Sequence, residues 1–73
     1  MWYIKDLKRL RSLFVEKGFL TLTSIAKQFD VSKNTVSNWF KGGGIQYGRA
    51  ISIAQFLNQD VDDLFRRQNG EED

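Results

Sequence analysis

Apolar residues recur along the chain at helical spacing, and no segment alternates between apolar and polar residues for long enough to predict a strand. The pattern predicts five helices, at about 3–17, 24–29, 33–41, 47–57 and 61–67. The first of them has an apolar stripe that recurs every three or four residues, formed by Tyr3, Leu7, Leu10 and Phe14. We therefore expect an all-α domain in which five helices pack their apolar faces into one core.

Residues that cap or interrupt helices stand at the ends of these segments. Thr21 or Thr23 is expected to cap the second helix and Ser32 the third, because a hydroxyl there accepts a hydrogen bond from an otherwise unpaired backbone N–H. Asp60 is expected to cap the fifth helix in the same way. The first, third and fourth helices are expected to end at Gly18, at the glycine triplet 42–44 and at Asn58.

Composition narrows the range of functions. The 73 residues fit one small domain, and the absence of His and Cys excludes disulfides, zinc-finger sites and Ser-His or Cys-His catalysis. The longest apolar runs, 2–4 and 13–15, are three residues each, so neither a membrane span nor a secretory segment is predicted. We expect a cytoplasmic domain without enzymatic activity, cofactor, metal, membrane contact or small-molecule ligand.

Charge is distributed unevenly along the chain. Residues 1–59 hold nine Lys or Arg against three Asp or Glu, a net charge of +6, whereas 60–73 hold two against six, a net charge of −4. A basic region of this kind favours a polyanionic partner, although ordinary surface solvation gives the same balance. In the fifth helix the pairs 62/66 and 63/67 are expected to form ion pairs four residues apart. An acidic flexible tail, 69–73, is expected to follow a domain over 1–68.

The segment 21–42 has the features that two helices crossing steeply at a short turn require. The small side chain of Ala26 allows the two helices to approach closely, and Val31 fills the corner after a turn at Asp30. Val36 and Trp39 anchor the second helix from below. Such a pair projects its second helix outward, as entry into the major groove of DNA demands.

This segment resembles the helix-turn-helix of the lambda-type repressor and Cro family. The likeness rests on Ile25-Ala26, Val31-Ser32, Thr35-Val36-Ser37 and Trp39, and the stretch 57–65 is similar to the ending of many members. The resemblance spans about 5–66 and implies a compact five-helix DNA-binding domain with the helix-turn-helix at helices two and three. The sequence departs from the family at Asp30, where Gly is usual, and at Leu22, where a polar residue often contacts phosphate.

The third helix has a positively charged residue in its first turn, where such a charge destabilises a helix. Lys33 stands in its first turn, where a positive charge costs about 0.3–1 kcal/mol but suits a phosphate or a guanine edge. Contacts to bases are expected from Lys33, Asn34, Ser37 and Asn38. Contacts to the DNA backbone are expected from Thr21, Thr23, Lys27, Gln28, Ser32, Thr35, Lys41 and Arg49. For each of these the alternative is a helix cap, a packing contact or plain solvated surface.

The resemblance implies a small phage-type Cro or repressor that regulates transcription by occupying an operator, within the nucleoid of a bacterium or a phage-infected host. One helix reads about four or five base pairs, which discriminates poorly against a genome. We therefore expect a homodimer on a near-palindromic operator with half-sites about 34 Å apart. Phe56 and Phe65 are expected to form its interface.

Two alternatives stay open: a helix-turn-helix module for phage packaging, excision or plasmid maintenance, and a protein-interaction module such as an anti-repressor or antitoxin.

Overall fold

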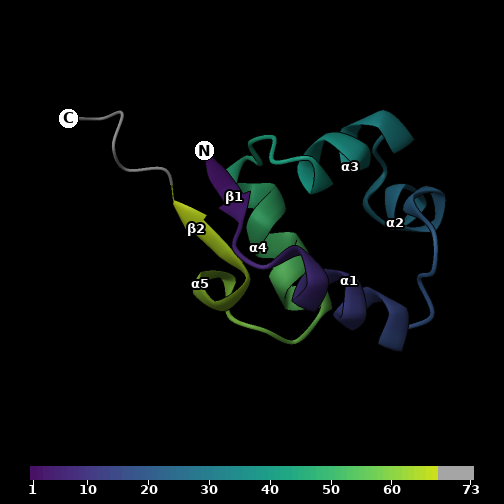
Figure 1. Cartoon of the computed structure of the whole chain (residues 1–73), viewed down its shortest axis with the longest axis horizontal. Helices are drawn as coiled ribbons and strands as arrows, with labels where there is room; N and C mark the ends of the chain where they lie inside the picture. Colours follow the sequence, from purple (N-terminus) through teal and green to yellow (C-terminus); the bar gives the residue numbers. More distant parts are fainter. Residues whose placement is uncertain (68–73) are drawn as a thin grey trace.

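The computed structural model describes residues 1–67, and they form a mostly helical fold around one core (Figure 1). Its helices are α1 (Leu7–Glu16), α2 (Leu22–Phe29), α3 (Lys33–Phe40), α4 (Tyr47–Phe56) and α5 (Val61–Leu64). Two short strands, β1 (Trp2–Ile4) and β2 (Phe65–Arg67), pair at the end of the molecule away from α2, where β1 contacts α3. The five-helix order predicted from the sequence is confirmed, whereas the small sheet was not predicted. The proposed tail, 69–73, lies outside the described residues.

The first helix begins four residues later than predicted. The Asp6 carboxylate accepts a hydrogen bond from the Arg9 backbone N–H at 3.2 Å, and this cap starts α1 at Leu7. Tyr3 therefore does not belong to the α1 stripe but lies in β1, which runs antiparallel to β2 with Tyr3 opposite Arg66. A three-residue strand is too short for its side-chain period to be recognised in the sequence.

The fifth helix is one turn long and ends at Leu64, not at residue 67. The chain leaves the helix there because Phe65 enters the core, where only 1% of its surface remains exposed. Arg66 and Arg67 consequently belong to β2, so the predicted i,i+4 pairs with Asp62 and Asp63 lack the helix they need. Asp60 precedes α5 as predicted, but its side chain makes no capping hydrogen bond.

The other predicted helix ends agree with the structure to within two residues. Thr21 caps α2 through a hydrogen bond from the Ser24 N–H at 3.1 Å, and Ser32 caps α3 through one from the Thr35 N–H at 3.1 Å. Asn58 adopts the left-handed conformation predicted for it, with φ 57°, and Gly18 does so with φ 91°. These ends are therefore fixed by local residue chemistry.

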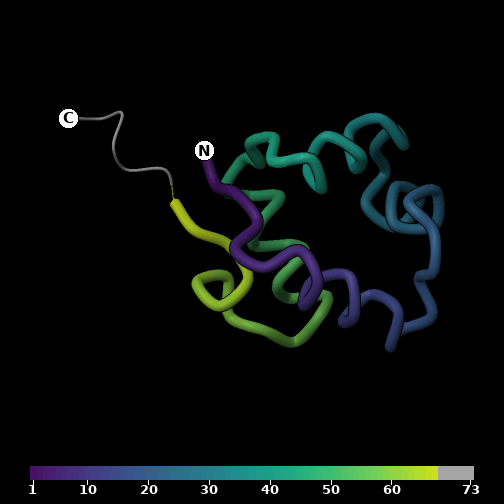
Figure 2. The backbone as a smooth tube through the Cα atoms, viewed as in Figure 1, coloured from purple at the N-terminus to yellow at the C-terminus, as the bar shows by residue number. Residues whose placement is uncertain are grey.

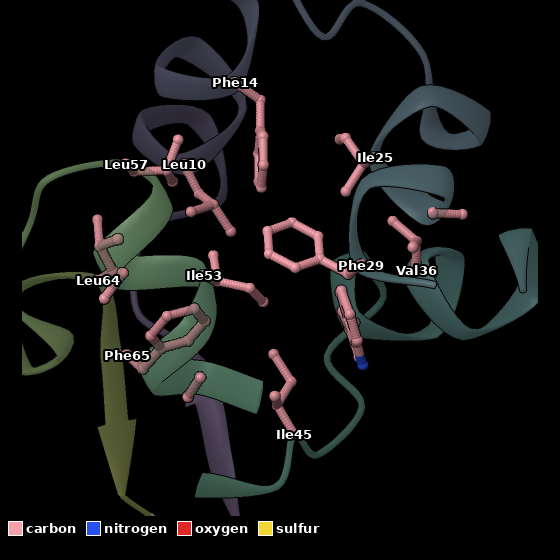
Figure 3. Packing of buried hydrophobic residues seen from close by; sticks show 14 residues of the cluster. Leu10, Phe14, Ile25, Phe29, Val36, Ile45, Ile53, Leu57, Leu64 and Phe65 are labelled. Atoms are coloured by element: carbon pink, nitrogen blue, oxygen red, sulfur yellow. The ribbon is translucent and has the colours of Figure 1, made fainter. Parts of the chain in front are cut away.

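The core contains residues from every helix and from β2 (Figure 3), and Trp2 and Ile4 of β1 pack against it. Its centre is aromatic: the ring of Phe29 from α2 packs edge-on against Phe14 of α1 at 6.2 Å and against Phe56 of α4 at 5.6 Å between centroids. Phe65 is buried in the same core, which contradicts its predicted role in a dimer interface. Phe56, half-buried, is already engaged by its aromatic neighbours.

The start of the chain is joined to the loop that follows α3 (Figure 2). Trp2 donates a backbone hydrogen bond to the Ile45 carbonyl at 2.8 Å and accepts one from the Ile45 N–H at 2.7 Å. Ile45 itself is buried. β1 thus lies between this loop and β2, and it brings the end of β2 to the side of the molecule on which α3 ends.

Candidate nucleic-acid interface

The turn between α2 and α3 fixes the direction in which α3 leaves the core. Asp30 ends α2 in the left-handed conformation with φ 57°, and the Val31 N–H returns to the Ala26 carbonyl at 3.0 Å. Ala26 is buried between the helices, where a larger side chain would separate them. The turn is therefore built without the glycine usual at this position, because Asp tolerates the left-handed region better than most residues.

One face of α3 is anchored in the core and the opposite face is open. Val36 is fully buried and 6% of Trp39 is exposed, so these two side chains fix the rotation of the helix about its axis. Lys33, Asn34 and Asn38 are exposed on the other side. Ser37, half-buried, and Lys41, exposed just after the helix, share this face by helical periodicity. The structure thus brings together all four residues predicted to contact bases.

The beginning of α3 is positively charged and uncompensated. No acidic residue occurs in its first turn, which contains Lys33 next to the helix end that carries the positive pole of the macrodipole. The hydroxyls of Ser32 and Thr35 lie 2.9 Å apart, so the cap and the first-turn threonine also bond to each other. Ser32 is nevertheless exposed and Thr35 is half-buried.

The residues of α2 predicted to contact the DNA backbone lie on its exposed side. Thr21 forms a reciprocal capping box with Ser24, while Thr23, Lys27 and Gln28 are exposed. Leu22, which replaces a polar residue in the family pattern, packs half-buried against the core. The first turn of α2 therefore presents hydroxyl groups from Thr21 and Thr23 rather than from residue 22.

Arg49 has a structural function that its predicted role as a surface contact did not include. Its Nη1 donates a hydrogen bond to the Phe29 carbonyl at 2.8 Å, which joins α4 to the end of α2. The guanidinium is half-buried and lies at the negative end of the α2 macrodipole, where a cation is stabilising. Sequence spacing does not reveal this bond, because the two residues are 20 positions apart on different helices.

The described residues contain no group of three or more carboxylate, His or Cys side chains arranged to hold a metal ion. Within residues 1–67, no helix has both the length and the apolar character needed to cross a membrane. What the site offers is a ridge of amide, hydroxyl and ammonium groups. Such groups suit the hydrogen-bonding edges of bases and the oxygens of phosphates.

Residues 15–64 match the family model for helix-turn-helix domains, a span of more than half the chain that includes α2 to α5. Neither the curated proteins nor the solved structures contain a match to this sequence.

Proposed function

Because the chain belongs to the lambda-repressor-like helix-turn-helix family of DNA-binding domains, we propose that it is a sequence-specific transcriptional regulator of the Cro or repressor type. It acts by occupying an operator, so that bound protein itself blocks access to a promoter. The observation that carries this proposal is the open face of α3, whose cationic first turn is set by Lys33 and whose rotation is fixed by Val36 and Trp39.

In this proposal α3 lies in the major groove and α2 lies across the DNA backbone. Bases are read by Lys33, Asn34, Ser37 and Asn38, since an ammonium suits guanine O6 and N7 and an Asn amide pairs with adenine. Phosphates are contacted by Thr21, Thr23, Lys27, Gln28, Ser32, Thr35, Lys41 and Arg49. For Arg49 this requires the guanidinium N–H groups that are not bonded to Phe29.

We further propose that two copies bind a near-palindromic operator in the cytoplasm, because one exposed helix gives too little discrimination among genomic sites. Phe65 takes no part in this contact, since it is buried in the core of each copy. Sedimentation of the protein with and without operator duplex is expected to give two chains per duplex. One chain per duplex at saturation would contradict the dimer.

The central experiment is selection of bound duplexes from a random DNA pool. We expect a shared motif with two half-sites about 34 Å apart, which corresponds to one turn of DNA. The matched control is a chain with both Lys33→Ala and Asn34→Ala, which leaves every core residue in place and is expected to enrich no motif. Recovery of an unbiased pool by the unaltered chain would contradict sequence-specific regulation.

A further inference from the structure

A trough leads from the flank of α3 to the end of β2. Its first part lies beside α3 and is lined by Thr35, Arg49, Gln46 and Met1, among others. Its second part is lined by Met1, Trp2, Gln46, Tyr47 and Arg67. Both parts are lined by Met1 and Gln46, so they adjoin, and together they reach from Thr35 beside α3 to Arg67, 32 positions later in the sequence.

The walls of the trough are held by specific contacts. The two backbone hydrogen bonds between Trp2 and Ile45 fix β1 to the loop after α3. Trp2 lies opposite Arg67 in the sheet, and its ring packs against Tyr47 with 5.2 Å between centroids. β1 therefore lies between the end of β2 and the start of α4 and joins the two (Figure 1).

Among residues 1–67, those that line the trough include cations but no carboxylate. Arg49 and Arg67 line it, and no Asp or Glu is among the residues that line either part. By contrast, the hollow beside the start of α1 combines Lys5, Lys8 and Arg9 with Asp6 and Asp63. In the part of the chain that the structure describes, no acid thus offsets the charge of the trough, whereas two acids offset part of the charge in the hollow beside α1.

The remaining polar groups of the trough are hydrogen-bond donors of the kind that contact phosphate oxygens. Tyr47, 54% exposed, contributes a phenol, Gln46 an amide and Thr35 a hydroxyl. Arg67 contributes a guanidinium, which binds phosphate through two parallel hydrogen bonds. These groups line two adjoining hollows between α3 and the end of β2.

We propose that Arg67, assisted by Tyr47 and Gln46, binds a backbone phosphate of the same duplex that α3 reads, outside the segment covered by the helix-turn-helix. This inference rests on the proposed function, and it assigns DNA contact to a strand that the helix-turn-helix motif does not include. The contact adds affinity without adding base preference, because phosphates carry no sequence information.

The chain provides a matched control for the test. Arg66 is also exposed and carries the same charge, but alternation along β2 directs its side chain to the opposite face of the sheet, and it does not line the trough. Arg66→Gln and Arg67→Gln therefore change the net charge of the protein equally. A difference between the two variants in affinity for the duplex therefore indicates a local contact by Arg67 and not long-range electrostatic attraction.

The experiment measures the affinity of the full chain for its selected duplex between 50 and 200 mM salt. Arg67→Gln is expected to reduce the slope of log K against log salt by about 0.9 for each bound copy, or about 1.8 for the proposed dimer, so its loss of affinity is about twelvefold larger at 50 mM than at 200 mM. Arg66→Gln is expected to keep the slope of the unaltered chain. Tyr47→Phe is expected to weaken binding at every salt concentration without a change of slope, since it removes a neutral donor.

A second arm locates the phosphate. Duplexes shortened at the flank by one base pair at a time should reach a length at which the unaltered chain and Arg67→Gln bind equally. If Arg67→Gln and Arg66→Gln have the same slope on the long duplex, the inference is overturned while the proposed function stands. If the unaltered chain binds no selected duplex, the proposed function fails first, and this inference fails with it.

Discussion

Single side chains at the ends of α2 and α3 determine how the exposed helix begins and what charge it carries. Ser32 accepts the Thr35 N–H, Asp30 takes the left-handed conformation between the helices, and Lys33 adds a cation to the positive end of α3. The Ser32 cap stabilises the start of α3, whereas Lys33 opposes the macrodipole. A residue that costs local stability on an open face is an indication of binding.

We expect Lys33→Ala to separate stability from binding. The free energy of unfolding should rise by about 0.3–1 kcal/mol because an unfavourable charge is removed from the helix start. Affinity for the operator should fall by about 1–3 kcal/mol, with base preference relaxed at one position. Denaturant melts and titration of single-base operator variants measure the two effects.

Lys27→Ala is the control for this prediction. Lys27 is exposed on α2, away from the proposed base-reading face, so its replacement should weaken all duplexes alike. Equal losses of affinity on every duplex for both variants would contradict the assignment of Lys33 to base recognition.

Asp30→Gly is expected to stabilise the domain by up to about 1 kcal/mol. Glycine adopts a φ of 57° without the steric penalty that a Cβ atom imposes, and this gain exceeds the extra entropy of the unfolded chain. Asp30→Ala keeps the Cβ atom and should give no such gain. Thermal unfolding of the three chains measures the order, and identical melting temperatures would show that residue 30 bears no strain.

At the scale of elements, the α2–α3 pair is held in place by contacts from α4. Phe56 packs against Phe29, and Arg49 donates to the Phe29 carbonyl, so the last residue of α2 is fixed through both its ring and its backbone. Neither contact follows from the pattern of α4 alone. The orientation of α3 therefore depends on a helix that carries few of the residues proposed to contact DNA.

Arg49→Met tests this connection. Methionine preserves most of the packing but removes the charged donor, and a half-buried carbonyl without its partner should lower the free energy of unfolding by about 1–2 kcal/mol. Lys27→Met, at an exposed position, should change it by less than about 0.5 kcal/mol. Equal melting curves for both variants would show that Arg49 does not brace the helix pair.

The elements that were predicted correctly differ from those that were not in how far apart in the sequence their stabilising contacts lie. Helices α2, α3 and α4 were predicted to within two residues because caps and breakers bound them locally. By contrast, residues 3–4 and 65–67 were assigned to helices, since each strand is three residues long and is held by hydrogen bonds to residues far away in the sequence. Phe65, whose burial ends α5, likewise pairs with Ile4, which lies near the other end of the chain.

At the scale of the whole molecule, the net charge of +2 does not describe the charge on the surface proposed to contact DNA. The fold leaves the cations of α2, α3 and β2 exposed, and the described acids of the C-terminal part lie in and before α5. A domain of this kind attracts a polyanion locally although its overall charge is small.

We expect operator affinity to fall steeply with salt as a consequence. With six to ten phosphate contacts in a dimeric complex, the binding constant should decrease by about 10³–10⁵ between 50 and 200 mM salt. Fluorescence anisotropy of a labelled duplex measures it. A response of less than about tenfold would indicate an apolar interface instead, and would favour the alternative of a protein-interaction module.

The sequence by itself determined the features that arise within one turn of helix or one short turn: the three central helices, the caps at Thr21 and Ser32, the left-handed Asn58, and the polar character of the face of α3. Only the tertiary structure decided the two-stranded sheet, the bond from Arg49 to α2, the burial of Phe65 and the trough that ends at Arg67. The reason is physical. Local features are stabilised by neighbours a few residues away, whereas a strand pair or an interhelical hydrogen bond gains its free energy from groups that chain connectivity does not bring together.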